Sequence, residues 1–297
     1  MIYGIKAVLG NLLGIIPAGR DLRVYDDDTF LLSYTRSGNL WTRFLVANLV
    51  HPHLEVRLSN IEQLVPDTTV CSNRALKRTP RPRFIKSHNY FDHRYKRVLY
   101  IVRDPRDVVL SYYHFQRKCH QIADDYPLKR YVDNFVTDTV GSNFYGSWFE
   151  NVISWIMTRY PDPNFLLLRY EDMIGDTLRE VARIAAFLGL SCSEARLNEV
   201  IALSSADRLR KLEKEEADVW IGSKNRRQDI PMVRVATSGG WHTALPRDCV
   251  AKIETAWGGL MSTLGYELST ISDAPHFPAT GIGVGFRPSW NGAPQVP

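Results

Sequence analysis

The sequence predicts an α/β fold, with a single domain built on a central, mostly parallel sheet flanked by helices. Apolar runs typical of buried strands occur at 29–34, 97–102 and 164–168, and each is followed by a stretch with helical spacing. Strands that alternate with helices favour a parallel sheet, because a parallel pair needs a long crossover connection. The 297 residues, 44% of them apolar, suffice for one large core.

The first predicted strand, 29–34, leads into a turn at 35–39 and then into a predicted helix. The helix is indicated by the spacing of Leu40, Trp41, Phe44, Leu45, Asn48 and Leu49. A glycine turn between a strand and a helix offers unpaired N–H groups and the positive end of a helix dipole to an anion. The ATP-binding form of this loop requires GxxxxGK followed by Ser or Thr. The segment 33–41 lacks the first glycine and the lysine, so we predict a P-loop-like phosphate site that differs from a kinase loop.

A second short strand is predicted at 83–86, and the third is the continuous apolar run RVLYIV at 97–102. Such a run is typical of a strand buried on both faces. It stops at Arg103, where Asp104 can cap a helix and Pro105 can begin it.

The second half continues with a helix predicted at 148–159, a strand at 164–168 and a helix at 178–188. The charge run 211–216 is interpreted as a solvated helix face. From residue 274 onward Pro and Gly dominate, which predicts a loosely ordered tail. We therefore divide the chain into an N-terminal segment at 1–28, one domain at 29–265 and a C-terminal tail at 266–297.

Residues 1–20 have apolar positions at helical spacing between Lys6 and Arg20. The stretch is too short and too interrupted for a confident membrane span. An amphipathic helix is the favoured interpretation, and membrane contact or a signal peptide stays open as the alternative.

The composition limits the ligand and the compartment. The net charge of +5, from 37 basic and 32 acidic residues, suits a small anionic ligand better than nucleic acid. The four cysteines form no CxxC pair and the histidines show no metal-site spacing, so we expect a cytoplasmic, reducing compartment and no metal site.

Several motifs occur in one order along the chain. Arg36-Ser37-Gly38 with Trp41 comes first, followed by KSH at 86–88, RDPRDVVLSYYHF at 103–115 and RYEDM at 169–173. This series resembles the cytosolic-type sulfotransferases, including their bacterial relatives, over roughly residues 29–265. The resemblance implies sulfuryl transfer from 3′-phosphoadenosine 5′-phosphosulfate (PAPS) to a hydroxyl or amine of a small-molecule acceptor, with no metal required.

The resemblance implies that the first loop holds the 5′-phosphosulfate end of PAPS, mainly through backbone N–H groups. The loop residues are Ser37, Gly38, Asn39, Leu40 and Trp41, and the Trp41 ring would also lie beside the adenine. Arg36 stands where the family usually has lysine, and either cation can stabilise charge on the oxygen between phosphorus and sulfur. The family often has two threonines at Asn39 and Leu40, and Leu40 cannot donate a side-chain hydrogen bond.

For the rest of the donor, the resemblance implies that Arg103 and Ser111 grip the 3′-phosphate. Arg234 and Gly239 belong to RVATSGGW at 234–241, where Val235 and Ala236 replace Lys and Gly. A backbone contact at Ala236 is expected only if the turn does not need a positive φ. The adenine contacts would be Tyr170 and Ser204, and Ala206 stands where many members have an aromatic ring.

His88 matches the catalytic base of the family and Lys86 its second cation. The acceptor must lose a proton as it attacks, and an imidazole with an unperturbed pKa of about 6.5 suits that task. The acceptor itself is not decoded. Its pocket is expected from 72–83, 89–96 and 118–146, and the oligomeric state stays open.

Two alternatives remain. A nucleotide or nucleoside kinase would need a Walker lysine and magnesium ligands, which are not found. A non-catalytic nucleotide-binding protein of the same fold is favoured by the departures at Arg36, Leu40, Ala206 and Val235, and is opposed by the intact Lys86 and His88.

Overall fold

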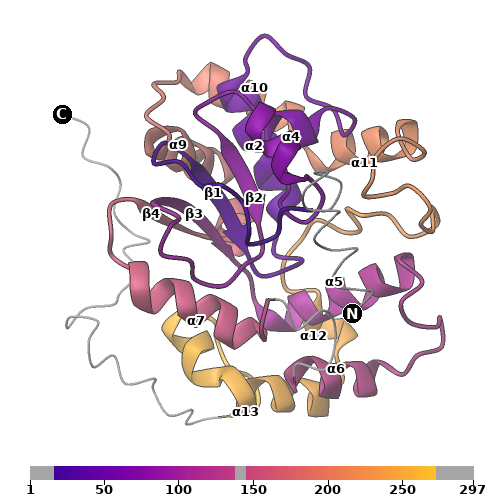
Figure 1. Cartoon of the computed structure of the whole chain (residues 1–297). Helices are drawn as coiled ribbons and strands as arrows, with labels where there is room; N and C mark the ends of the chain where they lie inside the picture. Colours follow the sequence, from indigo (N-terminus) through magenta and orange to yellow (C-terminus); the bar gives the residue numbers. More distant parts are fainter. Residues whose placement is uncertain (1–16, 138–144, 272–297) are drawn as a thin grey trace, which may run out of the picture.

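The computed structural model describes residues 17–137 and 145–271 (Figure 1). The strands β1 (Thr29–Ser33), β2 (Phe84–Ser87), β3 (Arg97–Val102) and β4 (Phe165–Arg169) form one sheet in the order β2-β1-β3-β4. Every strand pairing within it is parallel, which confirms the predicted sheet. Chain order reverses beside β1, and in open parallel sheets ligands bind outside the carboxyl ends of the strands at such a reversal.

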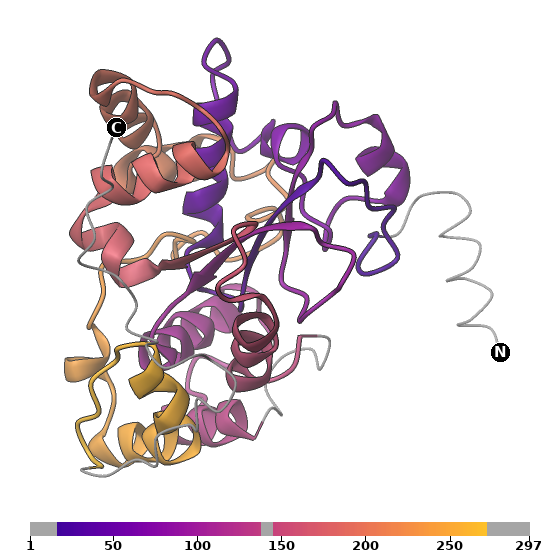
Figure 2. The same cartoon turned by 90° about the vertical axis from the view of Figure 1, so that its left-hand side faces the viewer.

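Helices cover both faces of the sheet (Figures 1 and 2). One layer contains α5 (Pro105–Lys118), α6 (Leu128–Val136), α7 (Trp148–Arg159), α12 (Trp241–Ala244) and α13 (Arg247–Thr263). The other contains α2 (Asn39–Val50), α9 (Thr177–Phe187), α10 (Glu194–Leu203) and α11 (Ala206–Glu215). The short helices are α3 (Ile61–Leu64), α4 (Asn73–Arg78) and α8 (Tyr170–Gly175).

The alternation of strand side chains produces the two cores. Along β3, Val98 and Tyr100 pack in the layer of α5, α7 and α13, whereas Leu99 and Ile101 pack in the layer of α2 and α9. Successive side chains of a strand point to opposite faces, so a continuous apolar run is what a doubly covered strand requires.

The start of α5 follows the predicted chemistry. The Asp104 side chain accepts a hydrogen bond from the Arg106 N–H, and Pro105 is the first residue of α5. Ser147 and Glu150 form a capping box at the start of α7. These local hydrogen bonds satisfy N–H groups that a helix start leaves unpaired.

The charge run 211–216 is only in part the solvated face that its composition predicts, because Lys211, Lys214 and Glu215 are exposed. Glu213 and Glu216 are buried, and the Glu213 carboxylate forms an ion pair with Lys118 Nζ at 3.0 Å. The Glu216 carboxylate pairs with Arg57. The prediction was wrong at these two positions because their partners lie far away in the sequence.

The packed structure also extends beyond the predicted domain at both ends. The N–H of Ala18 donates to the Cys71 carbonyl at 2.8 Å, and Leu22 is buried. At the other end Tyr266 is buried, and the Thr270 N–H donates to Glu254 at 2.8 Å. Most of the predicted N-terminal helix and the tail from 274 lie outside the described residues. Within the described ranges no helix is long and apolar enough to cross a membrane.

Candidate active site

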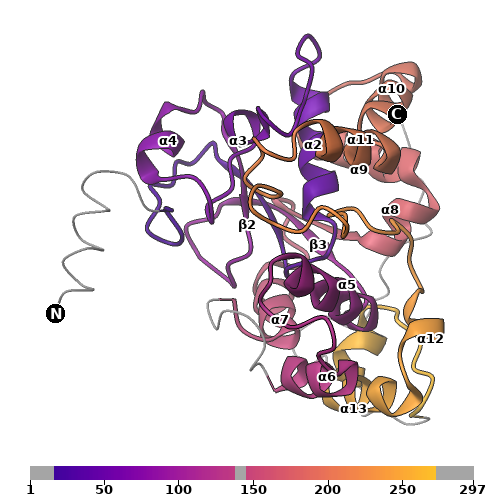
Figure 3. The ribbon, with the colours of Figure 1, turned by 90° about the vertical axis from the view of Figure 1, so that its right-hand side faces the viewer.

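A cavity of about 810 Å³ lies at the carboxyl ends of the strands. Arg36 follows β1, Lys86 and His88 lie at the end of β2, Arg103 follows β3 and Tyr170 follows β4, and all of them line it. The segment between α11 and α12 runs across this region between the two helical layers (Figure 3), and its residues 232–237 also line the cavity. Motifs that are far apart in the sequence are therefore brought to one site.

The turn between β1 and α2 has the backbone shape of an anion-binding loop. Arg36 and Gly38 have positive φ values of 64° and 97°, and α2 begins at the next residue, Asn39. A Cβ on Gly38 would lie 2.6 Å from Cδ2 of Tyr170, so only glycine fits there. The turn therefore directs the first N–H groups of a 12-residue helix toward the cavity.

Polar atoms of this loop point to an anionic ligand. The hydroxyl oxygens of Thr35 and Ser37 are buried without a hydrogen-bond partner among the described residues. Buried polar groups are nearly always paired in proteins, so such atoms require an explanation. Asn39, in contrast, donates to the Leu31 carbonyl at 3.3 Å and to Ser33 Oγ at 3.1 Å, which ties the loop to β1.

Arg36 reaches across the cavity to α5. Its Nε donates to Ser111 Oγ at 3.2 Å, one terminal nitrogen donates to the Met232 carbonyl at 3.0 Å, and the guanidinium lies over the Phe115 ring. Burial, together with the positive charge of Arg103, lowers the Arg36 pKa to about 10. The structure thus joins the predicted leaving-group cation and a predicted 3′-phosphate ligand directly.

Arg103 and Arg234 also face this cavity. Arg103 donates to the carbonyls of Arg36 and Thr237 at 3.3 and 3.1 Å and lies over the Tyr170 ring. Burial and the charge of Arg103 lower the pKa of Arg234. Cations held close enough to repel one another define a site whose natural ligand is an anion.

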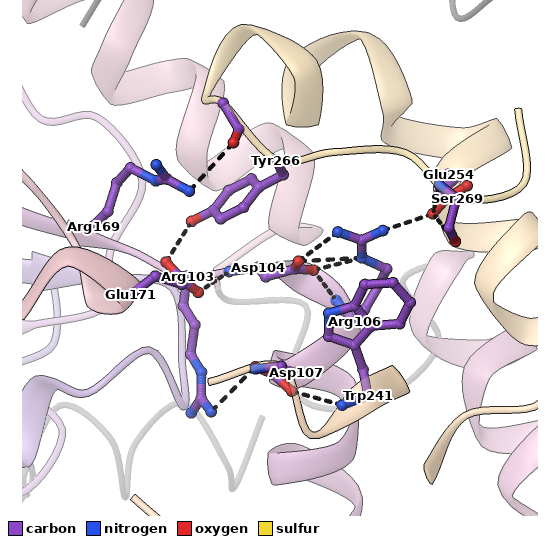
Figure 4. Close-up of polar contacts among 12 residues, drawn as sticks. Arg103, Asp104, Arg106, Asp107, Arg169, Glu171, Trp241, Glu254, Tyr266 and Ser269 are labelled. Atoms are coloured by element: carbon purple, nitrogen blue, oxygen red, sulfur yellow. Dashed lines mark hydrogen bonds and ion pairs between the residues drawn. The ribbon is translucent and has the colours of Figure 1, made fainter. Parts of the chain in front are cut away.

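Asp107 organises the segment after Arg234. Its carboxylate accepts the N–H groups of Gly239 at 2.7 Å and Trp241 at 3.1 Å (Figure 4). Gly239 itself is not among the residues that line the cavity. Ala236 has a φ of 59°, so the turn does need the positive φ that would have favoured glycine.

A buried network of ion pairs and hydrogen bonds fixes the turn after β3 (Figure 4). Arg106 pairs with Asp104 and Glu254, each at 2.6 Å. Glu171 accepts from the Asp104 N–H and the Tyr266 hydroxyl, each at 3.0 Å. These contacts tie α5, α8 and α13 together and so fix the position of Arg103.

The predicted adenine contacts are only partly brought together. The rings of Trp41 and Tyr170 line the cavity in an edge-to-face pair, with centroids 5.9 Å apart. Ser204 is fully buried, accepts from Asn48 at 3.1 Å and is not part of the lining, whereas Ser205 and Ala206 are. Trp220, which the sequence analysis missed, also lines the cavity, and its Nε1 has no partner among the described residues.

His88 is held in one tautomer. Its Nδ1 lies 2.8 Å from the Ser33 carbonyl oxygen, which can only accept, so Nδ1 carries the proton and Nε2 is left as the basic nitrogen. Burial and the charge of Lys86 lower the His88 pKa to about 3. The imidazole is therefore neutral, as a general base must be.

The segments predicted to form the acceptor pocket, 72–83, 89–96 and 118–146, contribute little to the lining of the cavity within the described residues. Of their described residues only Tyr145 lines the cavity, with its ring 5.6 Å from that of His88. Tyr112 and Phe115 of α5 also line it. Within the described ranges there is no group of His, Cys, Asp or Glu side chains that could hold a metal ion.

The fold and the cavity define an α/β protein whose first strand-to-helix loop, at the carboxyl edge of its sheet, has the shape of an anion-binding loop. Residues 26–265 match the family described as the sulfotransferase domain. The chain belongs to the sulfotransferase family.

Individual relatives agree with this assignment. Sulfotransferase 4A1 of Mus musculus is 32% identical over 195 residues, which are 61% of this chain and 66% of that protein. Sulfotransferase 2A1 of Rattus norvegicus is 31% identical over 231 residues, which are 73% of this chain and 78% of that protein. The chain thus spans just under two thirds of the length of the mouse relative.

Solved structures share the fold. A retinol dehydratase in complex with androsterone and the inactive cofactor PAP superposes with a TM-score of 0.71 at 20% identity, over 82% of this chain and 83% of that one. A mouse sulfotransferase complexed with PAP superposes with a TM-score of 0.65 at 21% identity, over 84% and 88% of the two chains.

Proposed function

We propose that this protein is a PAPS-dependent sulfotransferase that acts on a hydroxyl or amine of a small molecule. The observation that carries the proposal is the joint placement of Arg36, Lys86, His88 and Arg103 around one cavity at the sheet edge. Family membership and the PAP named in the solved relatives support the choice of nucleotide.

The residues fit the donor. The unpaired hydroxyls of Thr35 and Ser37 and the start of α2 suit the 5′-phosphate, and the rings of Trp41 and Tyr170 suit the adenine. Arg103 and Arg234 supply charge-assisted donors for the 3′-phosphate. Bound PAPS supplies the sulfuryl group and the leaving nucleotide.

Within this site, His88 Nε2 takes the proton that the attacking hydroxyl or amine loses. Arg36 and Lys86 place positive charge where negative charge develops. Arg36 holds Ser111 and therefore lies where the two phosphate subsites meet. No metal ion has a role in this scheme.

The acceptor is proposed to be partly aromatic or apolar, because Tyr112, Phe115 and Tyr145 line the cavity. The solved relatives name androsterone and retinol, which are small apolar alcohols. A reducing, cytoplasmic compartment is proposed from the four cysteines, all of which are free.

Calorimetric titration with adenosine 3′,5′-bisphosphate in the absence of magnesium tests the donor site, with ATP as the control. We expect binding that strongly favours the bisphosphate. Arg103→Ala should weaken binding of the bisphosphate by about 1.5 to 3 kcal/mol but affect adenosine 5′-phosphate much less. Equal losses for both nucleotides, or a magnesium-dependent preference for ATP, would contradict the proposal. A screen with PAPS and a panel of phenols, alcohols and amines then separates an enzyme from a binding protein.

A further inference from the structure

A buried ion pair that the sequence analysis missed lies in the wall of the cavity. Lys86 Nζ donates to Asp67 Oδ2 at 2.7 Å, and the two side chains are only 9% and 10% exposed. Asp67, Lys86 and His88 all line the cavity. The pair is therefore part of the candidate active site and not of the distant core.

The backbone holds the pair in place. The Lys86 N–H donates to the Pro66 carbonyl at 2.8 Å, and the Thr68 N–H donates to the Lys86 carbonyl at 3.0 Å. These two hydrogen bonds form an isolated parallel bridge between Asp67 and Lys86. The two side chains are thus attached to adjacent, paired backbone segments.

Asp67 is itself fixed by its neighbours. Its Oδ1 accepts from the Thr69 N–H at 2.8 Å and from the Thr69 hydroxyl at 2.7 Å, while Oδ2 accepts from Lys86. Both oxygens are engaged within the protein, so binding a cationic acceptor would require breaking these contacts. The carboxylate therefore acts on Lys86.

A second ion pair lies behind the first. Arg43 pairs with Glu62 at 2.9 Å, and Glu62 Oε2 also accepts the Asp67 N–H at 2.9 Å. The Cys71 thiol lies 3.6 Å from that same oxygen and stays neutral, since burial and the Glu62 charge raise its pKa to about 12. The cations of this cluster are Arg43 and Lys86, and its anions are Glu62 and Asp67. Because His88 is neutral, these charges balance.

The balance matters because burial favours the uncharged form of the lysine. Burial lowers the Lys86 pKa, Asp67 and Glu62 oppose that effect, and Arg43 adds to it. Burial disfavours ionisation of Asp67 as well, but the positive charges of Lys86 and Arg43 bring its pKa down to about 2. One of the three N–H groups of the ammonium serves Asp67, which leaves two for a ligand.

We propose that Asp67 is a positioning residue for the transfer step: it holds the Lys86 ammonium, charged and oriented, in the cavity wall beside His88. The inference rests on the proposed sulfotransferase function and deepens it. Lys86 can stabilise developing charge on the sulfuryl group only while it is protonated. Asp67 therefore sets the alkaline limit of turnover.

The same strand region offers a matched control. Arg83, just before β2, pairs with Asp28 through Nε at 2.8 Å, and both side chains are fully buried. Neither residue is among those that line the cavity. Asp28→Asn thus breaks a buried ion pair near Lys86 without touching the site.

The first experiment is an NMR titration of lysine side chains in the full chain, with the Lys86 signal assigned by its loss in Lys86→Arg. We expect Lys86 to deprotonate at lower pH in Asp67→Asn than in the wild type. Asp67→Glu should restore much of the difference, and Asp28→Asn should leave the Lys86 titration unchanged. Should Asp67→Asn not fold, Thr69→Val removes one hydrogen bond to Asp67 and should shift Lys86 in the same direction by less.

The second experiment follows turnover of PAPS and unsubstituted phenol, whose hydroxyl stays largely protonated in this range, from pH 6 to pH 9. Asp67→Asn should lose turnover roughly tenfold at pH 9 and much less at pH 6, because acid restores the Lys86 charge. The affinity for adenosine 3′,5′-bisphosphate should stay within roughly twofold of the wild type, since the phosphate ligands are unchanged.

The outcomes separate the two proposals. If the wild type neither binds the bisphosphate nor turns over PAPS with any acceptor, the proposed function is wrong. Suppose instead that the wild type turns over PAPS, and that folded Asp67→Asn has the same Lys86 titration and the same pH profile as the wild type. This result would overturn only the role of Asp67. A loss of stability equal to that of Asp28→Asn, with no change in pH profile, likewise overturns it.

Discussion

At the scale of single residues, the tautomer of His88 and its charge are determined by different parts of its environment. The Ser33 carbonyl determines which nitrogen carries the proton, and burial beside Lys86 keeps the ring neutral. A depressed pKa means that the His88 ring of the free protein is neutral over the whole physiological range. An exposed histidine would lose much of its basic form below pH 6.5.

His88→Ala should lower turnover by roughly two orders of magnitude or more, as expected for the loss of a general base. Binding of adenosine 3′,5′-bisphosphate should be nearly unchanged, because the phosphate ligands remain. Steady-state kinetics and calorimetry on the same preparation measure both quantities. Turnover close to that of the wild type would remove the assignment of His88 as base.

The protonation state of His88 can be measured in the free protein. Its folded pKa of about 3 lies below the ordinary 6.5, so the His88 ring signals should not titrate between pH 5 and 8. NMR spectra of the histidine rings, recorded across this pH range, measure it. A His88 titration midpoint near 6.5 would show that burial does not control this group.

At the scale of elements, the turn between Arg234 and Trp241 is built on left-handed backbone at two positions. Gly239 adopts a φ of 77° without strain, whereas Ala236 adopts 59° with a Cβ present. Left-handed backbone costs a non-glycine residue roughly 1 kcal/mol. The substitution of Ala at 236 thus preserves the turn at a cost in stability.

Ala236→Gly should therefore raise the free energy of unfolding by a few tenths to about 1 kcal/mol, because glycine adopts a positive φ without a Cβ clash. Thermal or denaturant unfolding measures the change. Val235→Gly, at the adjacent position with no positive φ, is the matched control and should not stabilise. A lower melting temperature for Ala236→Gly would show that the backbone at Ala236 is not strained.

At the scale of the whole molecule, a few buried polar contacts join segments far apart in the sequence. Arg106 pairs with Glu254, and Glu171 binds the Tyr266 hydroxyl (Figure 4). These contacts hold the carboxyl end of β3, from which Arg103 projects, against α13 and the segment that follows it. The donor site thus depends on the chain beyond residue 263.

Arg106→Ala should cost about 3 to 5 kcal/mol, because it leaves the Asp104 and Glu254 carboxylates buried without their cation. Arg117→Ala on the same helix breaks a partly exposed pair with Asp124 and should cost less than about 1 kcal/mol. Chemical denaturation compares the two variants directly. Equal costs would mean that the buried triad does not tie α5 to α13.

Glu171 gives the molecule a predictable pH dependence. Burial raises its folded pKa from 4.5 to about 7, so its contribution to stability is fully present below pH 4.5 and is lost as pH rises through about 7. Glu171→Gln should abolish this part of the pH dependence of the free energy of unfolding, which amounts to about 1 kcal/mol or more. Unfolding measured at several pH values between 4 and 8 tests it. A wild-type profile that Glu171→Gln leaves unchanged would contradict the raised pKa.

The local pattern of the sequence was sufficient for the strands, several helices and the glycine turn between β1 and α2. Strand and helix periodicity, the cap at Asp104 and the glycine at 38 act through neighbouring residues, and those neighbours are visible in the sequence. The motifs also predicted that Arg36, Lys86, His88 and Arg103 belong together. The family match confirms the resemblance on which that grouping rested.

Only the tertiary structure decided which charges are buried and what they face. The sequence analysis does not single out Asp67 and interprets Glu213 as a solvated charge. Each is buried against a lysine, Asp67 against Lys86 and Glu213 against Lys118. Their partners are distant in sequence and follow no periodicity, so no local pattern reports them. Burial and long-range pairing set the protonation state of a side chain, and both exist only once the chain has folded.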